Sequence, residues 1–219
     1  MHTLYNLVSG PLVWLSFLIF IGGSIYRITT MASLAKEKDS AVFEYMNFYY
    51  ASRSIVHWIV PFGSENMKKH PGMTVVTFVF HICLICLPLF VFAHVILWKE
   101  SWNISWWYLS DGLADLMTLA VIASCIFFLV RRLTVPEVKY LTSNSDFVIL
   151  ALVAAPFVTG FWAYHQLPAY RLMGILHILS GEIMLAAIPF TRLSHALFFL
   201  FTRGYTGSEF GAVKNAKDW

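Results

Sequence analysis

The stretch "FHICLICLPLFVFAHVILW", residues 80–98, decides the fold. It contains no Asp, Glu, Lys or Arg, and it is about as long as the roughly 20 apolar residues that a helix needs to cross a bilayer. It also carries two histidines, His81 and His94, on either side of Pro88. An imidazole in hydrocarbon is costly unless a partner satisfies it. The stretch therefore predicts a membrane helix and raises the question of what its histidines bind.

The composition extends this prediction to most of the chain. Of 219 residues, 58% are hydrophobic and 12% are charged, whereas soluble domains carry about 25% charged residues. A net charge of +3 is too small to indicate a nucleic-acid partner. The sequence contains no Gly-rich phosphate loop. Three cysteines lie in apolar runs, and we interpret them as packing residues: Cys83, Cys86 and Cys125.

Five apolar segments predict an all-α integral membrane protein, with one membrane domain over residues 1–219. Backbone groups in lipid must pair within helices or closed barrels, and these segments are too long and too uniformly apolar for barrel strands. Between the first two spans, residues 32–72 predict an amphipathic connection. The N-terminal segment lacks the positively charged region of a signal peptide, so we expect it to be the first span. The predicted spans are 11–30, 73–98, 112–130, 146–164 and 170–201.

The positions of the basic residues predict the orientation. Lys and Arg are frequent in the first connection, in the third connection and in the C-terminal tail, and sparse in the other two connections. Such residues gather on the cytoplasmic side of a membrane. We therefore expect a multi-pass protein of the cell inner membrane, with a periplasmic N-terminus and a cytoplasmic C-terminus. The amphipathic connection would then be the cytoplasmic surface on which a soluble partner docks.

Four histidines lie inside the predicted spans and fall into two layers. In the predicted orientation, His81 and His195 lie toward the cytoplasm, and His94 and His177 lie toward the periplasm. With a rise of 1.5 Å per residue, the thirteen steps from His81 to His94 cover about 20 Å, and the eighteen from His177 to His195 cover about 27 Å. Two pairs at two depths are what two bis-histidine haem b groups require.

The helical phase of these histidines leaves two arrangements open. At about 100° per residue, His177 and His195 share one face of a continuous helix, whereas His81 and His94 lie roughly 140° apart. Either a kink at Pro88 changes the phase, or the two haems lie on opposite flanks of the second helix. The pattern also leaves two alternatives to haem. One is a histidine-lined conduit for protons or metal ions, and the other is a haem-free membrane anchor.

The segment "LHILSGEIMLAAIPFTRLSHALFFLF", residues 176–201, resembles the C-terminal haem-binding helix of the respiratory nitrate reductase gamma-subunit family. That family has a histidine, a Gly-containing turn and a P-F-[ST]-R-L-x-H motif that ends eighteen residues after the first histidine. "FHICL" at 80–84 is similar to the opening of its second helix. In the nitrate reductase members of this family, a second histidine follows the first one of this helix by ten residues. This chain has Val91 at that position. The matching residues are His177, Gly181, Pro189, Phe190, Thr191, Arg192, Leu193 and His195.

Residues 53–95 are more similar to the cytochrome b subunits of the Tmc and Dsr membrane complexes of sulfate reducers, and the compact length favours the Tmc type. This resemblance implies a dihaem cytochrome b that exchanges electrons with menaquinone. It would be the membrane subunit of a quinone-linked oxidoreductase, without complete catalytic activity alone. The resemblance also implies two partners, a cytoplasmic iron–sulfur subunit similar to heterodisulfide reductase and a periplasmic multihaem cytochrome c.

Quinone chemistry also needs groups that exchange protons. Asp111 and Asp115 open the third span near the predicted periplasmic layer, and Glu182 lies five residues deeper than His177. Alternatively, the two aspartates are ordinary acids that favour a helix N-terminus through its dipole. Arg192 is a candidate partner for a haem propionate, or it only marks the cytoplasmic boundary.

Overall fold

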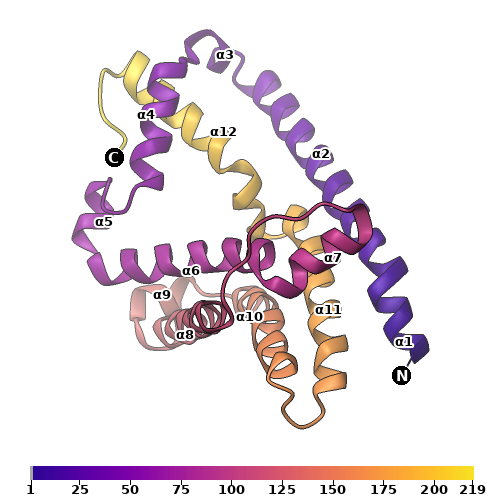
Figure 1. The fold of residues 1–219 in the computed structure, drawn as a ribbon. Coiled ribbons are helices and arrows are strands. Elements are labelled where there is room, and N and C mark those ends of the chain that lie inside the picture. The colour runs from indigo at the N-terminus through magenta and orange to yellow at the C-terminus, as the bar shows by residue number, and fades with distance from the viewer. Residues whose placement is uncertain (1) are drawn as a thin grey trace. The chain divides into compact units, whose positions relative to one another are not determined.

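The structure is a computed structural model that describes residues 2–219, without the side chains of His2 and Val42. The described residues are 84% helical and contain no β-strand, so the predicted all-α class is confirmed (Figure 1). The α-helices are α1 His2–Leu7, α2 Val13–Lys38, α3 Val42–Tyr45, α4 Phe48–Ile59, α5 Glu65–Lys69, α6 Pro71–Phe90, α7 Phe92–Trp102, α8 Asp111–Thr134, α9 Pro136–Leu141, α10 Asn144–Tyr164, α11 Tyr170–Ala187 and α12 His195–Ser208.

Among the described residues, five helical segments are long and apolar enough to cross a membrane. This confirms the predicted number of candidate spans, while their orientation and the membrane in which they lie stay predictions. The first segment is longer than predicted at both ends, because a π-helical turn, Val8–Leu12, joins α1 to α2 and α2 continues to Lys38. The five segments are Thr3–Lys38, Pro71–Phe90, Asp111–Thr134, Asn144–Tyr164 and Tyr170–Phe190.

The second predicted span, 73–98, is two helices instead of one. α6 ends at Phe90, Val91 has an extended backbone with φ −68° and ψ 133°, and α7 begins at Phe92. The last carbonyls of a helix have no partner within it, and leaving them unpaired in lipid is costly. Donors from later residues pair with them here: Pro88 O with His94 Nδ1, Leu89 O with Trp106 Nε1, and Phe90 O with the Leu109 N–H.

The fifth predicted span, 170–201, is also divided. α11 ends at Ala187, a 3₁₀ turn covers Ile188–Phe190, and Thr191 is extended, with φ −123° and ψ −173°. Pro189 has no N–H with which to continue the helix. The hydroxyl of Thr191 then pairs with the broken backbone, donating to Ala187 O and accepting from the Leu193 N–H.

A second short 3₁₀ turn, Arg192–Ser194, precedes His195, which is the first residue of α12. His177 lies on α11, on the other side of this interruption. The prediction that His177 and His195 share one face of a continuous helix is therefore wrong, because no continuous helix joins them.

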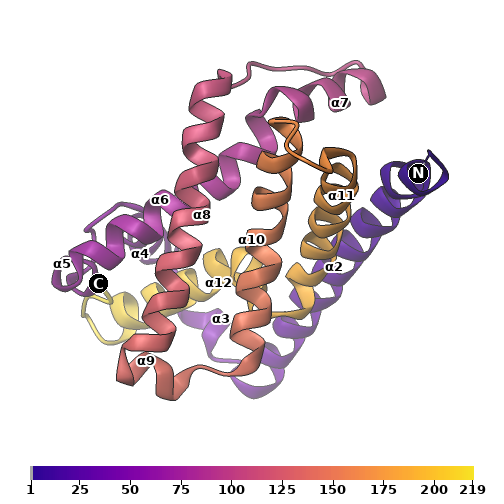
Figure 2. The ribbon, with the colours of Figure 1, turned by 90° about the horizontal axis from the view of Figure 1, so that it is seen from below.

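The chain divides into two compact units, Val76–Gly181 and Met1–Val75 with Glu182–Trp219. In the first of these ranges, α8 and α10 lie side by side and are joined at one end by α9 (Figure 2). We call this the α8–α10 unit. The packing role predicted for the cysteines is confirmed for Cys83 and Cys125, which are unpaired and buried. The core of the α8–α10 unit consists of Cys83, Leu87, Val121, Cys125 and Phe157.

The other unit, which we call the α4–α12 unit, is organised around the contact between these two helices (Figure 1). The predicted amphipathic connection therefore contains a helix that packs on the C-terminal helix. Small residues allow the close approach: a Cβ atom added to Gly207 would collide with the Cβ of Ser54. The C-terminal tail closes over this contact, since Arg203 lies 3.7 Å from the carboxylate of Asp218 and 4.2 Å from the Trp58 ring centroid. A single domain over residues 1–219 stays a prediction.

Candidate functional site

The candidate site is a pair of histidines in the α8–α10 unit. His94 of α7 and His177 of α11 have ring centroids 5.9 Å apart and ring planes within 16° of each other. Metal–nitrogen bonds of about 2 Å place the centroids of two imidazoles bound on opposite sides of one ion about 6 Å apart. The spacing also lies within the range of an offset-stacked ring pair. The structure therefore brings together the two histidines predicted for the periplasmic layer, at a separation that suits two ligands of one iron.

The hydrogen bonds of these two rings define which nitrogen carries the proton. His94 Nδ1 lies 3.0 Å from Pro88 O, and His177 Nδ1 lies 2.8 Å from Pro156 O. A carbonyl oxygen only accepts hydrogen bonds, so Nδ1 is the donor in both rings and Nε2 carries the lone pair. Histidines that bind metals usually donate their second ring N–H to such an acceptor, which fixes the tautomer and the ring orientation. Both side chains are thus in the form that binds a metal through Nε2.

Local sequence explains why both rings can take these positions. The carbonyl of Pro88 is open to His94 because the helix breaks at Val91, where no N–H of α7 replaces the missing helical donor. For His177, the position depends on Gly160 of the neighbouring α10 (Figure 2). A Cβ atom at Gly160 would lie 2.8 Å from Nδ1 of His177, which is closer than packed side chains allow.

The other two candidate ligands have the same kind of hydrogen bond. His81 Nδ1 lies 2.7 Å from Thr77 O in the α8–α10 unit, and His195 Nδ1 lies 2.8 Å from Arg192 O in the α4–α12 unit. The pairing of His81 with His195 stays a prediction. In His165, Nε2 contacts a carboxylate, Asp115 Oδ1, at 3.1 Å. Among the described residues, no three His, Cys, Asp or Glu side chains form a metal-binding group.

The two predicted aspartates link the start of α8 to the end of α10. Asp111 lies in the first turn of α8 and accepts a hydrogen bond from the Tyr164 hydroxyl. Asp115 pairs with His165, and both side chains are about one-third exposed. The alternative of two acids that favour a helix N-terminus stays a prediction. A role of either acid in quinone chemistry stays a prediction.

Glu182 and Arg192 differ in their surroundings. Glu182 is 9% exposed, and neither of its carboxylate oxygens has a hydrogen-bond partner among the described residues. An acid buried in this way fits a group that exchanges protons. Arg192 is exposed, and its backbone carbonyl orients His195. Its contact with a haem propionate stays a prediction.

Arg27 is a further candidate residue, and it was not among those predicted from the sequence. This side chain lies within the apolar run "IFIGGSIYRITT", residues 19–30, and a charge inside a membrane span is a signal of function that could have been followed. Its Nε atom is buried without a hydrogen-bond partner, and its guanidinium carbon lies 5.8 Å from the ring centroid of Phe198. Phe198 follows His195 by three residues on α12, so the two share a helix face. Arg27 therefore adds a positive charge near the side of α12 that carries His195.

A protein of Nitratidesulfovibrio vulgaris is 35% identical to the chain over 215 residues, which cover 96% of this chain and 95% of the relative. The relative is described only as a protein, so the similarity carries no activity. No family model matches the chain. No solved structure matches it either.

Proposed function

The chain belongs to the same family as this protein of Nitratidesulfovibrio vulgaris, and we propose that it is a dihaem cytochrome b of the inner membrane. In this proposal it passes electrons between the menaquinone pool and partner redox subunits of a respiratory complex of the kind found in sulfate reducers. The chain alone has no complete catalytic activity. One partner is a cytoplasmic iron–sulfur subunit similar to heterodisulfide reductase, and a second is a periplasmic multihaem cytochrome c.

The observation that carries the proposal is the geometry of His94 and His177, with parallel rings 5.9 Å apart and both Nδ1 atoms held by backbone carbonyls. A proton conduit does not need Nδ1 fixed on a carbonyl at each of its histidines, because each imidazole must change its protonation state in turn. A haem-free anchor does not need four histidines with the same tautomer. Axial ligation explains both features, because it requires a ring of fixed orientation whose Nε2 carries the lone pair.

Each haem supplies a one-electron iron centre when it is bound. The outer haem would be held by His94 and His177, and the inner one by His81 and His195. Positive side chains stabilise the negative charge of propionates, and in the α4–α12 unit Arg27 and Arg192 are the candidates for this role. The residues of the chain therefore orient the axial ligands, supply counter-charge and exclude water from the path of the electrons.

The pairing of ligands is tested by the haem content of four purified single variants. His94→Ala and His177→Ala should each remove one and the same b haem, whereas His81→Ala and His195→Ala should each remove the other. Redox titration measures the midpoint potential of the haem that is left, and variants that lose the same haem should share this potential. His165→Ala is the matched control and should keep both haems. If His81→Ala and His94→Ala remove the same haem, the proposed pairing is wrong.

A further inference from the structure

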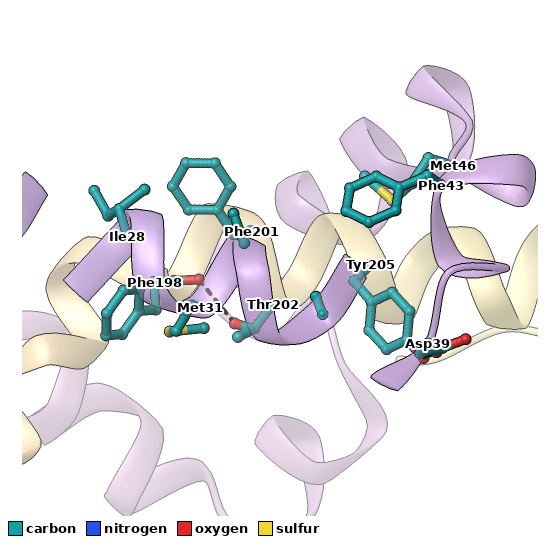
Figure 3. A pocket seen from close by; sticks show the side chains of 11 residues that line it. Ile28, Met31, Asp39, Phe43, Met46, Phe198, Phe201, Thr202 and Tyr205 are labelled. Carbon is teal, nitrogen blue, oxygen red and sulfur yellow. Dashed lines mark hydrogen bonds between the residues drawn. The ribbon is translucent and has the colours of Figure 1, made fainter. Parts of the chain in front are cut away.

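The α4–α12 unit contains a pocket of about 390 Å³ between α2, α12 and the segment around α3 (Figure 3). Its volume lies within the range of roughly 300–1,000 Å³ that is usual for pockets that bind small ligands. Most of its wall is apolar, with Ile28 and Met31 of α2 facing Phe198 and Phe201 of α12. α2 belongs to a candidate membrane span, so a ligand with an apolar body can reach the pocket from lipid.

One end of this pocket is polar. The Tyr205 hydroxyl donates to Asp39 Oδ2 at 2.9 Å, and the Tyr45 hydroxyl lies 3.3 Å from that of Tyr205. The hydrogen bonds with Tyr45 and Asp39 raise the pKa of Tyr205, so this phenol stays protonated at neutral pH. The other hydroxyl of the wall is occupied, because Thr202 donates to Phe198 O within its own helix. A ligand in the pocket therefore meets one carboxylate, one phenol and a long apolar surface.

These groups restrict the class of ligand. None of the described lining residues carries a positive charge, so the carboxylate of Asp39 disfavours fatty acids and the phosphate groups of lipids. A water-soluble polar ligand would leave its polar groups unpaired against the apolar wall. The suitable ligand is a neutral membrane compound with a hydrogen-bond donor at one end of an apolar ring system. A quinol has this chemistry, because either of its two ring hydroxyls is a donor and its ring and prenyl tail are otherwise apolar.

We propose that this pocket binds the ring of a membrane quinol, with one ring hydroxyl donating to Asp39 and Tyr205 orienting that carboxylate. The inference rests on the proposed exchange of electrons with quinone, and it assigns the quinol to residues other than Asp111, Asp115 and Glu182. The pocket lies at the end of α2 that carries Lys36 and Lys38. In the predicted orientation this is the cytoplasmic side, the same side as His195.

The test is a fluorescence titration of the purified protein with 2-heptyl-4-hydroxyquinoline N-oxide, an analogue of the quinol. The wild-type protein should quench the fluorescence of the probe, and the quenching should saturate as binding becomes complete. Asp39→Asn should weaken binding about tenfold or more, since a hydrogen bond to a charged group is lost, and Tyr205→Phe should weaken it less. Phe201→Trp fills the pocket and should abolish binding. Glu44→Gln and Leu200→Trp are matched controls, because both residues are exposed and neither lines the pocket.

Four results would overturn the inference. The first is a wild type with both haems that does not bind the probe, and the second is binding that is equally tight in all three pocket variants. The third is weakened binding in Asp111→Asn or Asp115→Asn instead. The fourth is loss of a copurified phospholipid in Phe201→Trp with unchanged binding of the probe, which would make the pocket a lipid site. Haem content is measured in every sample. Pocket variants that contain two haems and bind the probe as tightly as the wild type would contradict only the quinol site. The absence of haem in the wild type would contradict the proposed function itself.

Discussion

His94 caps the helix that precedes it. Its Nδ1 atom lies 3.0 Å from the carbonyl oxygen of Pro88, six residues earlier, and this bond is possible because α6 ends before it could use that carbonyl itself. The same bond leaves Nε2 as the atom with the lone pair, and the ring lies 5.9 Å from that of His177. The helix break and the candidate ligand position are thus parts of one local structure.

A methyl group at Gly160 should disturb the proposed outer haem. The added Cβ would lie 2.8 Å from His177 Nδ1, so Gly160→Ala should displace the ring or break its bond to Pro156 O. We expect about half of the haem to be lost, or the midpoint potential of the outer haem to change, because second-sphere hydrogen bonds tune the metal. Gly174→Ala on α11 is the control, since a Cβ there meets nothing within 4 Å. Equal haem content and equal potentials in the two variants would contradict this account of His177.

Removal of the charge of Arg27 should lower the midpoint potential of the inner haem. A positive charge near the iron disfavours the oxidised state, so Arg27→Gln should lower the potential, by on the order of tens of millivolts for a charge in a region of low dielectric constant. Lys36→Gln on the same helix is the control, because Lys36 is exposed near the end of α2 and water screens its charge. A shift as large in Lys36→Gln as in Arg27→Gln would show that Arg27 has no special position.

Close packing of α4 on α12 should make Gly207 sensitive to substitution. The Cβ of Gly207→Ala would collide with Ser54, and overpacking of this kind usually costs about 1–3 kcal/mol. Gly204 is a matched control one turn earlier, where a Cβ would meet Ala51 at 3.6 Å, an ordinary contact. Gly204→Ala should keep or increase stability, since alanine favours a helix over glycine by roughly 0.5–1 kcal/mol. Thermal unfolding in detergent measures both, and a Gly207→Ala variant as stable as Gly204→Ala would contradict the packing.

The Tyr205 phenol should ionise at a higher pH than an ordinary tyrosine. Its hydrogen bonds with Tyr45 and then Asp39 raise its pKa, so the native state holds this proton more tightly than the unfolded state does. The associated stability is present below the ordinary tyrosine pKa of about 10 and is lost as the pH rises through the folded-state pKa. The wild-type minus Tyr205→Phe tyrosinate absorbance isolates this group, and Tyr45→Phe should move its midpoint downward. A midpoint near pH 10 would rule out the hydrogen-bonded cluster.

The apolar spans could be predicted because they depend only on length and composition, and their number agrees with the structure, although the bounds of the first, second and fifth differ. The break at Thr191 had a local signal, because Pro189 cannot continue the helical hydrogen bonds. In the prediction from sequence, Pro189 served only as part of the family motif. The break at Val91 had a weaker signal. Pro88 predicts a kink, whereas the helix ends at Phe90, where Trp106 and Leu109 donate to its last carbonyls. Such distant partners have no signature in the local sequence.

The candidate site was predictable in part for the same reason. The predicted depth of a residue in the membrane follows from its position along a span. His94 and His177 could therefore be paired without coordinates. The contact of Gly160 with His177 and the polar cluster of Tyr45, Tyr205 and Asp39 join residues that are far apart in sequence. They depend on how helices pack, and periodicity within one segment does not specify that packing.

The most direct test of the central claim is a reduced-minus-oxidised absorption spectrum of the purified wild-type chain, combined with haem quantification by the pyridine haemochrome method. The account predicts the α-band of a low-spin b-type cytochrome and two haems per chain. A purified, folded chain that contains no haem after expression with sufficient iron and haem precursor would contradict it.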